Sequence, residues 1–84
     1  MNPRAKSVSC VSDTVLEITF LNGEVKLFDV QPYLSYPVYQ RLKDKEFFQK
    51  AHIVNGIVAW DNEIDFDPDT LYIEGKVATL NSNP

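Results

Sequence analysis

Residues 15–30, VLEITFLNGEVKLFDV, decide the fold of this chain. Apolar residues at positions 16, 18 and 20 alternate with polar residues at 17 and 19, the period of two that is typical of a strand with one buried face. Asn22-Gly23 follows, and these residue types tolerate the positive φ angles that a two-residue hairpin turn requires. We therefore predict a hairpin in which Phe20 lies opposite Val25, Ile18 opposite Leu27, Leu16 opposite Asp29 and Thr19 opposite Lys26.

The segments on either side of this hairpin extend the pattern. Residues 5–13, AKSVSCVSD, alternate in the same way and predict a third strand with Cys10 turned inward. Residues 51–60, AHIVNGIVAW, contain a second Asn-Gly pair, which predicts a hairpin with Ile53 opposite Val58. The sequence therefore predicts a three-stranded meander followed by a separate hairpin.

Two short helices are predicted, around residues 37–50 and 68–74. Asp44 can accept backbone N–H groups at the start of the first helix, and Asp67-Pro68 is a typical helix start. Gly75 is expected to end the second helix. The sequence thus predicts an α+β fold with one small antiparallel sheet, built from the meander and the second hairpin. We expect one domain over residues 1–75 and a C-terminal tail over residues 76–84.

Composition limits the kind of protein that this chain can be. Hydrophobic residues make up 44% and charged residues 24% of 84 residues, as in ordinary globular domains. Cys10 is the single cysteine, so no disulfide forms within the chain, which fits a reducing compartment. No signal peptide and no stretch of membrane-spanning length is evident. We expect a cytoplasmic protein that does not bind membranes.

Charge is distributed unevenly along the chain. Residues 1–60 carry seven Lys/Arg and six Asp/Glu, or +1, whereas residues 61–84 carry one Lys and six Asp/Glu, or −5. The acidic C-terminal part repels phosphate backbones, and there is no basic stripe. We therefore expect no nucleic-acid binding.

The acidic stretch at residues 60–75, WDNEIDFDPDTLYIEG, raises the question of a metal or catalytic site. A calcium loop that starts at Asp65 has Thr70 where glycine is needed and Lys76 where a bidentate glutamate is needed. No nucleophile or glycine-rich loop accompanies the carboxylates, and His52 is the only histidine. We expect no catalytic residue, no cofactor and no metal, and we interpret the stretch as a bend followed by a capped turn.

The order of NGEVKLFDV, PVYQRLKDKEFFQKAHI, GIVAW and DFDPDTLYIEG resembles a family of small bacterial proteins, domain of unknown function 2442. The resemblance implies a compact α+β domain without an established activity. Some members resemble one half of a toxin–antitoxin pair whose partner is a neighbouring small protein (domain of unknown function 4160). Some relatives also carry a helix-turn-helix region, whereas only nine residues follow Gly75 here.

Our first functional hypothesis is a protein-interaction or regulatory module with a protein partner, expected to be basic. Its predicted partner surface is the acidic set Asp61, Glu63, Asp65, Asp67 and Asp69. A second surface is the basic set Arg41, Lys43, Lys45 and Lys50, although such residues more often form an ordinary solvated helix face.

Two alternatives stay open. The first is a small enzyme or ligand-binding domain with a pocket between sheet and helices, which requires a cavity above roughly 300 Å³. Its lining would come from Tyr33, Tyr36, Tyr39, Trp60 and Tyr72. The second is a homo-oligomer that buries the apolar residues Val54 and Ile57.

Overall fold

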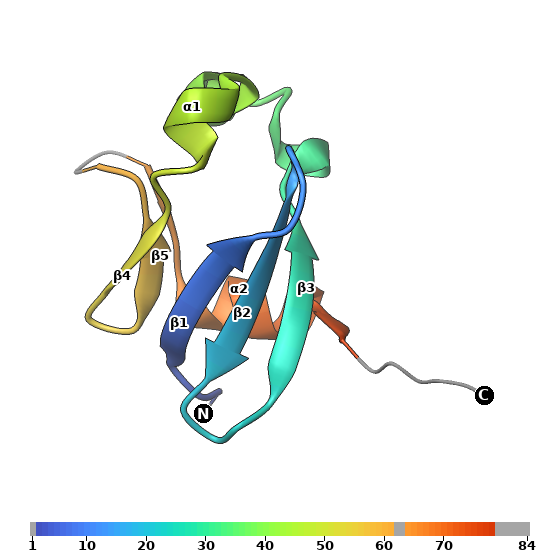
Figure 1. The fold of residues 1–84 in the computed structure, drawn as a ribbon, viewed down its shortest axis with the longest axis vertical. Helices are drawn as coiled ribbons and strands as arrows, with labels where there is room; N and C mark the ends of the chain where they lie inside the picture. The colour runs from blue at the N-terminus through green and yellow to red at the C-terminus, as the bar shows by residue number, and fades with distance from the viewer. Residues whose placement is uncertain (1, 62–63, 79–84) are drawn as a thin grey trace.

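The computed structural model describes residues 2–61 and 64–78 and confirms the α+β class (Figure 1). The strands are β1 (Ala5–Cys10), β2 (Val15–Phe20), β3 (Val25–Asp29), β4 (His52–Val54), β5 (Ile57–Ala59), β6 (Asp65–Phe66) and β7 (Lys76–Val77). The helical elements are the 3-10 turns η1 (Gln31–Tyr33) and η2 (Pro37–Lys43) and the α-helices α1 (Lys45–Phe48) and α2 (Pro68–Glu74).

The strands form two antiparallel sheets where the sequence predicted one. The first has the order β1-β2-β3-β7, so the predicted meander is extended by the chain after α2. The second has the order β4-β5-β6, so the predicted second hairpin is joined by the strand that precedes α2. A backbone hydrogen bond of 2.9 Å from Ala5 to Gly56 links the first sheet to the β4–β5 turn.

The predicted register of the β2–β3 hairpin is wrong by one residue. Thr19 pairs with Val25, Ile18 with Lys26 and Leu16 with Phe28. The reason is a three-residue loop, because the Phe20 N–H donates to the Glu24 oxygen at 2.8 Å and, within residues 21–23, only Gly23 has a positive φ, of 91°. After two-residue loops, the next most common hairpin loop has three residues and ends with a residue, usually glycine, in the left-handed region. An Asn-Gly pair is compatible with both loops. Lys26 and Glu24 are thereby moved to the face that carries Ile18 and Phe20.

The second hairpin follows its prediction. Ile53 pairs with Val58, and the turn residues Asn55 and Gly56 have φ angles of 50° and 85°. Two consecutive positive φ angles are what the predicted two-residue turn requires. The Gly56 position is also crowded, because an added Cβ would lie 2.7 Å from the Cβ of Arg4.

The predicted helix starts are confirmed at both aspartates. The Asp44 side chain accepts the backbone N–H groups of Glu46 and Phe47, and the Asp67 side chain accepts that of Thr70 at 2.7 Å. The region predicted as a helix over residues 37–50 is divided into the 3-10 turn η2 and the single α-turn α1. Gly75 ends α2 as predicted, but with a φ of −71° rather than in the left-handed region.

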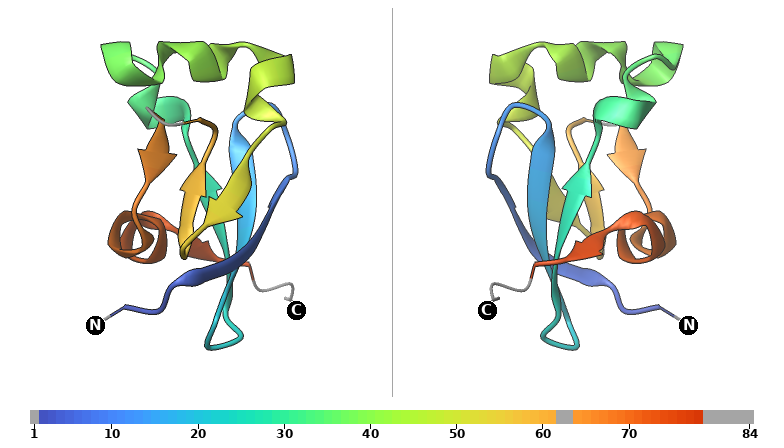
Figure 2. Two further views of the ribbon diagram at one scale, coloured as in Figure 1. Left: turned by 90° about the vertical axis from the view of Figure 1, so that its left-hand side faces the viewer. Right: turned by 90° about the vertical axis from the view of Figure 1, so that its right-hand side faces the viewer.

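The core lies between the two sheets and the helices. Figure 2 shows η2 and α1 across one end of the molecule and α2 near the other end, with the strands between them. The fully buried side chains come from the meander, both helical regions and the second sheet: Leu16, Ile18, Phe20, Phe28, Val30, Leu42, Phe48, Val58 and Leu71. Cys10 packs against this cluster, as its inward position predicted.

The end of the described chain remains attached to the first sheet. Lys76 and Val77, the first two residues of the predicted tail, pair with Leu27 and Lys26, and the Ala78 N–H donates to the Val25 oxygen at 3.0 Å. Residues 79–84 of that tail lie outside the described residues. Among the helices of the described chain, none has the length and apolar composition to cross a membrane.

Candidate functional site

A groove of about 580 Å³ lies beside β3. Three segments that are far apart in the sequence line it. The first segment is β2 and β3, which contribute Val15, Leu27, Phe28 and Asp29. The second is the η1 region, with Pro32, Tyr33 and Tyr36. The third is the end of α2 and the start of β7, with Glu74 and Lys76. Tyr33 and Tyr36 are two of the five aromatic residues that the sequence suggested for a pocket.

The groove lies where β7 stops pairing with β3. Backbone hydrogen bonds join Phe20 to Glu24 and Val30 to Thr14, so the hydrogen-bonded pairs of β2 and β3 fall on even-numbered residues. The main-chain groups of Val25, Leu27 and Asp29 therefore point to the opposite side of β3. β7 with Ala78 pairs with the first two of these residues and stops before Asp29. Among the described residues, the N–H and C=O of Asp29 are left without a backbone partner.

Tyrosine rings line one side of the groove and continue away from it. The ring of Tyr33 lies 5.6 Å from that of Phe28, 6.2 Å from that of Tyr36 and 5.9 Å from that of Tyr39. Tyr39 stacks on Phe66 at 4.6 Å, which ties the array to the second sheet. Tyr36 is 54% exposed, so its ring is the one most available to a ligand.

Carboxylates surround these tyrosines. Burial, and then the charge of Glu74, raises the pKa of the Tyr33 hydroxyl. Burial, and then the charges of Asp65 and Asp67, raises the pKa of Tyr39. A tyrosine hydroxyl is already neutral at physiological pH at its ordinary pKa of about 10, and the raised pKa of both residues strengthens this, so both can donate a hydrogen bond. We call Tyr33, Tyr36 and Tyr39, together with the carboxylates Asp29, Asp65, Asp67 and Glu74, the tyrosine face.

Most of the predicted acidic surface is engaged in local structure. Asp61 forms an ion pair with Arg41 at 2.6 Å, and its other oxygen accepts the Ile64 N–H at 3.2 Å. Asp67 caps α2, and Asp69 in the first turn of α2 accepts a hydrogen bond from Asn2 at 3.2 Å. Within the described ranges, Asp65 is the member whose exposed side chain has no such bond, and Glu63 lies outside them. Three of the four described members therefore already bind other groups of the domain.

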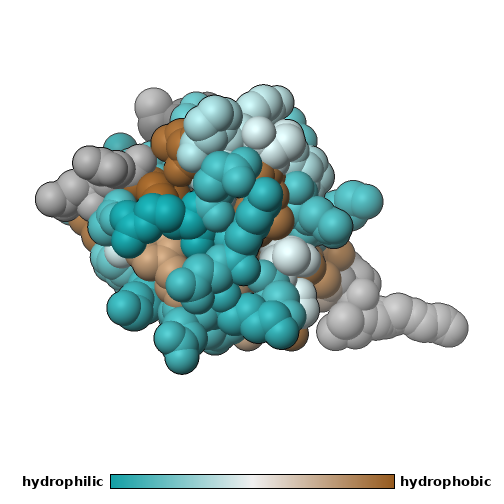
Figure 3. Space-filling model, turned by 90° about the horizontal axis from the view of Figure 1, so that it is seen from above, coloured by the Kyte–Doolittle hydropathy of each residue, from teal (hydrophilic) through white to brown (hydrophobic). Residues whose placement is uncertain are grey.

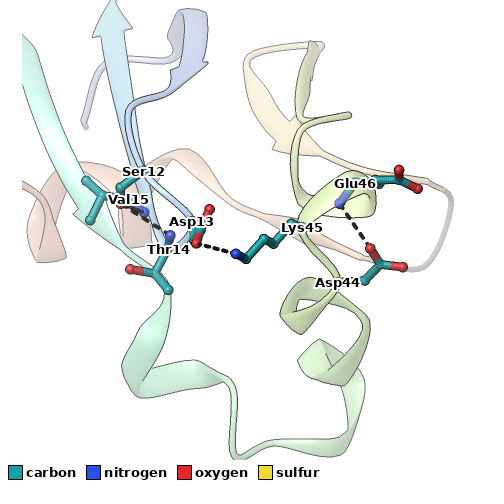
Figure 4. Close-up of polar contacts among 7 residues, drawn as sticks. All are labelled: Ser12, Asp13, Thr14, Val15, Asp44, Lys45 and Glu46. Atoms are coloured by element: carbon teal, nitrogen blue, oxygen red, sulfur yellow. Dashed lines mark hydrogen bonds and ion pairs between the residues drawn. The ribbon is translucent and has the colours of Figure 1, made fainter.

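The predicted basic surface is also partly neutralised. Arg41 pairs with Asp61 and its guanidinium lies 4.0 Å from the centre of the Phe47 ring. Lys45 reaches Asp13 at 3.3 Å across the gap between α1 and the β1–β2 turn (Figure 4). Lys43 and Lys50 are exposed. On the helical end of the molecule hydrophilic side chains predominate, and hydrophobic ones form small separate groups (Figure 3).

The other aromatic residues suggested for a pocket are used in packing. Trp60 is 4% exposed, and its Nε1–H donates to the Phe48 oxygen at 2.8 Å. Tyr72 packs edge-on against Phe20 with ring centres 5.2 Å apart. Its hydroxyl donates to Glu24 in a short hydrogen bond.

The reactive residue types of the chain lie outside the groove. Burial raises the pKa of the Cys10 thiol, whose Sγ lies 3.4 Å from the Phe48 oxygen. His52 is exposed on β4, with Nδ1 2.9 Å from the Lys50 oxygen. It borders a second hollow of about 250 Å³ that also contacts Val54, Ile57 and Asp65. In residues 2–61 and 64–78, no three His, Cys, Asp or Glu side chains are arranged to hold a metal ion.

The fold and groove define a small α+β domain in which β7 covers only part of the edge of β3. This chain belongs to the family described as Protein of unknown function (DUF2442), whose model matches residues 5–76. The matched range includes every residue that lines the groove. Neither the curated proteins nor the solved structures contain a protein that matches this chain.

Sequence reasoning did not identify Asp29, Glu74 or Lys76 as site residues. Asp29 lies more than forty positions before Glu74 and Lys76, and it meets them only because β7 returns to the edge of β3. The predicted register placed Asp29 opposite Leu16, at the far end of the apolar face of the hairpin. The only local signal was its position at the end of a strand, three residues before Pro32.

Proposed function

We propose that this domain is a non-catalytic protein-interaction module that binds a basic partner through the tyrosine face. The observation that carries this proposal is the groove beside β3, in which exposed aromatic rings lie next to Asp29 and Glu74. Tyrosine supplies large contact area at low conformational cost, and carboxylates select basic side chains. Asp29, Glu74 and Lys76 line the groove, and the charges of Asp65 and Asp67 act on the nearby Tyr39.

The resemblance to paired bacterial proteins supports a specific partner, the neighbouring small protein of a toxin–antitoxin-like pair. In such a pair the domain acts as a regulator by binding to its partner. The charge imbalance of the chain, −5 over residues 61–84, favours association with a basic protein. The single Cys10, which has no intramolecular disulfide partner, supports a cytoplasmic location.

Two features of the reactive residues support a role without catalysis. The raised pKa of the Cys10 thiol keeps it protonated, and the thiolate is the nucleophilic form. The exposed carboxylates of Asp67 and Asp69 are occupied by a helix cap and by Asn2. These groups therefore act as structural elements rather than as an acid–base pair.

Size-exclusion chromatography with light scattering tests the proposal directly. The domain is mixed at micromolar concentration with the small protein encoded next to it, and we expect a 1:1 complex. Tyr36→Ser should weaken the complex, because this ring is exposed and borders the groove. Val38→Ser is the matched control, since Val38 is 52% exposed, close to the 54% of Tyr36, and does not line the groove. Separate elution of the two proteins would rule out this partner.

The volume of the groove also supports a second candidate function, binding of a small cationic ligand. About 580 Å³ exceeds the roughly 300 Å³ at which ligand sites begin. Titration with arginine amide, followed by the NMR signals of Tyr33 and Tyr36, tests this alternative. Saturation at micromolar concentration would favour a small ligand, whereas a response only at millimolar concentration would oppose it.

Self-association through the second sheet is a separate proposal. Val54 is 40% exposed and pairs with the half-buried Ile57 on the outer face of the β4–β5 hairpin. The chromatographic run of the domain alone measures its mass. A dimer that Val54→Ser converts to a monomer would support this surface, and a monomer at all concentrations would exclude it.

A further inference from the structure

We infer that the groove binds an extended segment of the partner as a short added strand, with a basic side chain beside Asp29 and Glu74. This inference rests on the proposed function and names how the partner is held. The site is the position on the edge of β3 that follows Leu27, the last residue that pairs with β7.

The backbone geometry defines where the segment lies. Val25 and Leu27 use their outward main-chain groups to pair with Ala78 and Lys76. The next outward pair of groups belongs to Asp29, and the register of β7 would continue to Glu74. Glu74 is instead the last residue of α2, so the chain leaves the sheet there and the groove opens between Asp29 and Glu74. An incoming extended chain can donate to and accept from the Asp29 main chain, as in recognition by strand addition.

The side chains of the groove determine the chemistry of the occupant. A residue placed opposite Asp29 has its side chain on the same face of the sheet as the Asp29 carboxylate. One oxygen of that carboxylate accepts the Gln31 N–H at 2.9 Å, which orients the side chain. Glu74 adds a second negative charge, and the exposed Tyr36 ring offers a face for a guanidinium. An arginine in the segment can pair with the Asp29 and Glu74 carboxylates and stack on the Tyr36 ring.

The charges also exclude the opposite kind of segment. Asp29 and Glu74 together outweigh Lys76, so a glutamate at the same position would face net negative charge. Lys76 lies at the β7 side of the site and is paired through its main chain with Leu27. The site therefore prefers an extended segment with alternating basic and apolar residues, in which the apolar side chains point to the other face of the sheet, the face that carries Phe28.

A synthetic peptide tests this inference independently of the natural partner. The probe is the blocked pentapeptide Val-Arg-Val-Arg-Val, titrated into the full chain labelled with ¹⁵N and followed by NMR. We expect shifts at the amides of Asp29, Tyr33, Tyr36 and Glu74. Glu74→Gln should weaken binding by about twofold to fivefold, as expected for an exposed ion pair. Glu46→Gln, which removes an exposed carboxylate on α1, is the matched control and should not change the affinity.

Two further peptides separate strand addition from simple charge attraction. N-methylation of both arginine amides removes the donors that face Asp29 and should weaken binding by about twofold to tenfold. Replacement of both arginines with glutamate should abolish binding. Equal affinity for the N-methylated peptide, or no shift at the Asp29 amide up to millimolar concentration, would overturn the inference. A complex with the natural partner that survives Glu74→Gln unchanged would overturn it too, while leaving the proposed function intact.

Discussion

The Nζ atom of Lys26 lies 3.7 Å from the centre of the Tyr72 ring and donates a hydrogen bond of 2.6 Å to the Tyr72 main-chain oxygen. Lys26 lies on the same face of β3 as the buried Phe28, so its stem packs between the sheet and α2. The ammonium group meets a carbonyl in the last turns of α2, where the helix dipole favours positive charge. This contact attaches α2 to the meander and thereby helps to position Glu74 at the groove.

Replacement of Lys26 with methionine should lower the free energy of unfolding by about 1–2 kcal/mol. Methionine retains most of the apolar stem but loses the cation–π contact and the charged hydrogen bond. Urea denaturation measures the change. Lys6→Met, on the exposed side of β1, is the control and should stay within about 0.5 kcal/mol of the parent. Equal effects of the two substitutions would contradict this role of Lys26.

The hydrogen bond between Tyr72 and Glu24 predicts a pH dependence of stability at both ends of the pH scale. Hydrogen bonds from Tyr72 and then Asn22 lower the pKa of Glu24 below 4.5, and the bond to Glu24 raises the pKa of Tyr72 above 10.0. The Glu24 contribution is therefore complete above pH 4.5 and is lost as the pH falls through the lowered pKa. The Tyr72 contribution is complete below pH 10.0 and is lost as the pH rises through the raised pKa.

Tyr72→Phe should remove the Tyr72 effect and the largest part of the Glu24 effect, whereas the hydrogen bond from Asn22 to Glu24 remains. Its stability deficit relative to the parent should be constant between pH 4.5 and 10.0 and should shrink outside this window. Urea midpoints of the two proteins across the pH range provide the measurement. Carboxyl NMR should also show the pKa of Glu24 moving back towards 4.5 in the variant. A deficit that persists unchanged into acid would indicate that this hydrogen bond does not favour the ionised carboxylate.

Two glycines should respond to alanine for different reasons. At Gly75 an added Cβ would lie 2.5 Å from the Leu71 oxygen and 3.1 Å from the Lys26 Cβ, so the end of α2 must shift. At Gly23 no atom lies within 4 Å of the added Cβ, and the cost comes only from the φ of 91°. We expect losses of about 1–3 kcal/mol for Gly75→Ala and about 1–2 kcal/mol for Gly23→Ala.

These two substitutions also differ in their effect on the groove. Only Gly75→Ala should change the NMR signals of Glu74 and Lys76, because the strain arises between α2 and β3. Gly23→Ala should confine its shifts to the β2–β3 loop. Undisturbed groove signals in Gly75→Ala would show that this close approach does not position Glu74.

Trp60 predicts a cost for a single buried hydrogen bond. Trp60→Phe retains an aromatic ring next to Phe48 but removes the Nε1–H that donates to the Phe48 oxygen at 2.8 Å. We expect a loss of about 1–3 kcal/mol, because the donor is buried. Thermal unfolding followed by circular dichroism measures it. A change smaller than 0.5 kcal/mol, the range of ordinary surface substitutions, would show that the bond contributes little.

Local sequence signals predicted the elements of the fold better than their pairing. Turns and helix caps depend on residues that are close in sequence, so they can be predicted from short motifs. Examples are the two Asn-Gly turns, the Asp44 cap and the Asp67-Pro68 helix start. The register of β2 and β3 was missed because two-residue and three-residue loops both use Asn-Gly. One added loop residue then moves Lys26 from the solvent face to the face beneath α2.

Two tyrosines of the groove were among those suggested for a pocket, but its place at the edge of β3 was missed because it depends on pairing between distant segments. Lys76 and Val77 form only two residue pairs with β3, too short a strand for alternation to predict. The acidic stretch attracted attention because its carboxylates are neighbours in sequence. In the structure Asp61 pairs with Arg41 and Asp67 caps α2, so carboxylates that are neighbours in sequence have different structural partners.

The measurement that tests the central claim most directly is a comparative pull-down from the native host at low salt. Tagged parent protein and the Tyr36→Ser and Val38→Ser variants serve as baits, and the eluates are identified by mass spectrometry. The account predicts one small basic protein in equal amount with the parent and with Val38→Ser, and much less of it with Tyr36→Ser. Recovery of no such protein, or equal recovery by all three baits, would contradict an interaction through the tyrosine face.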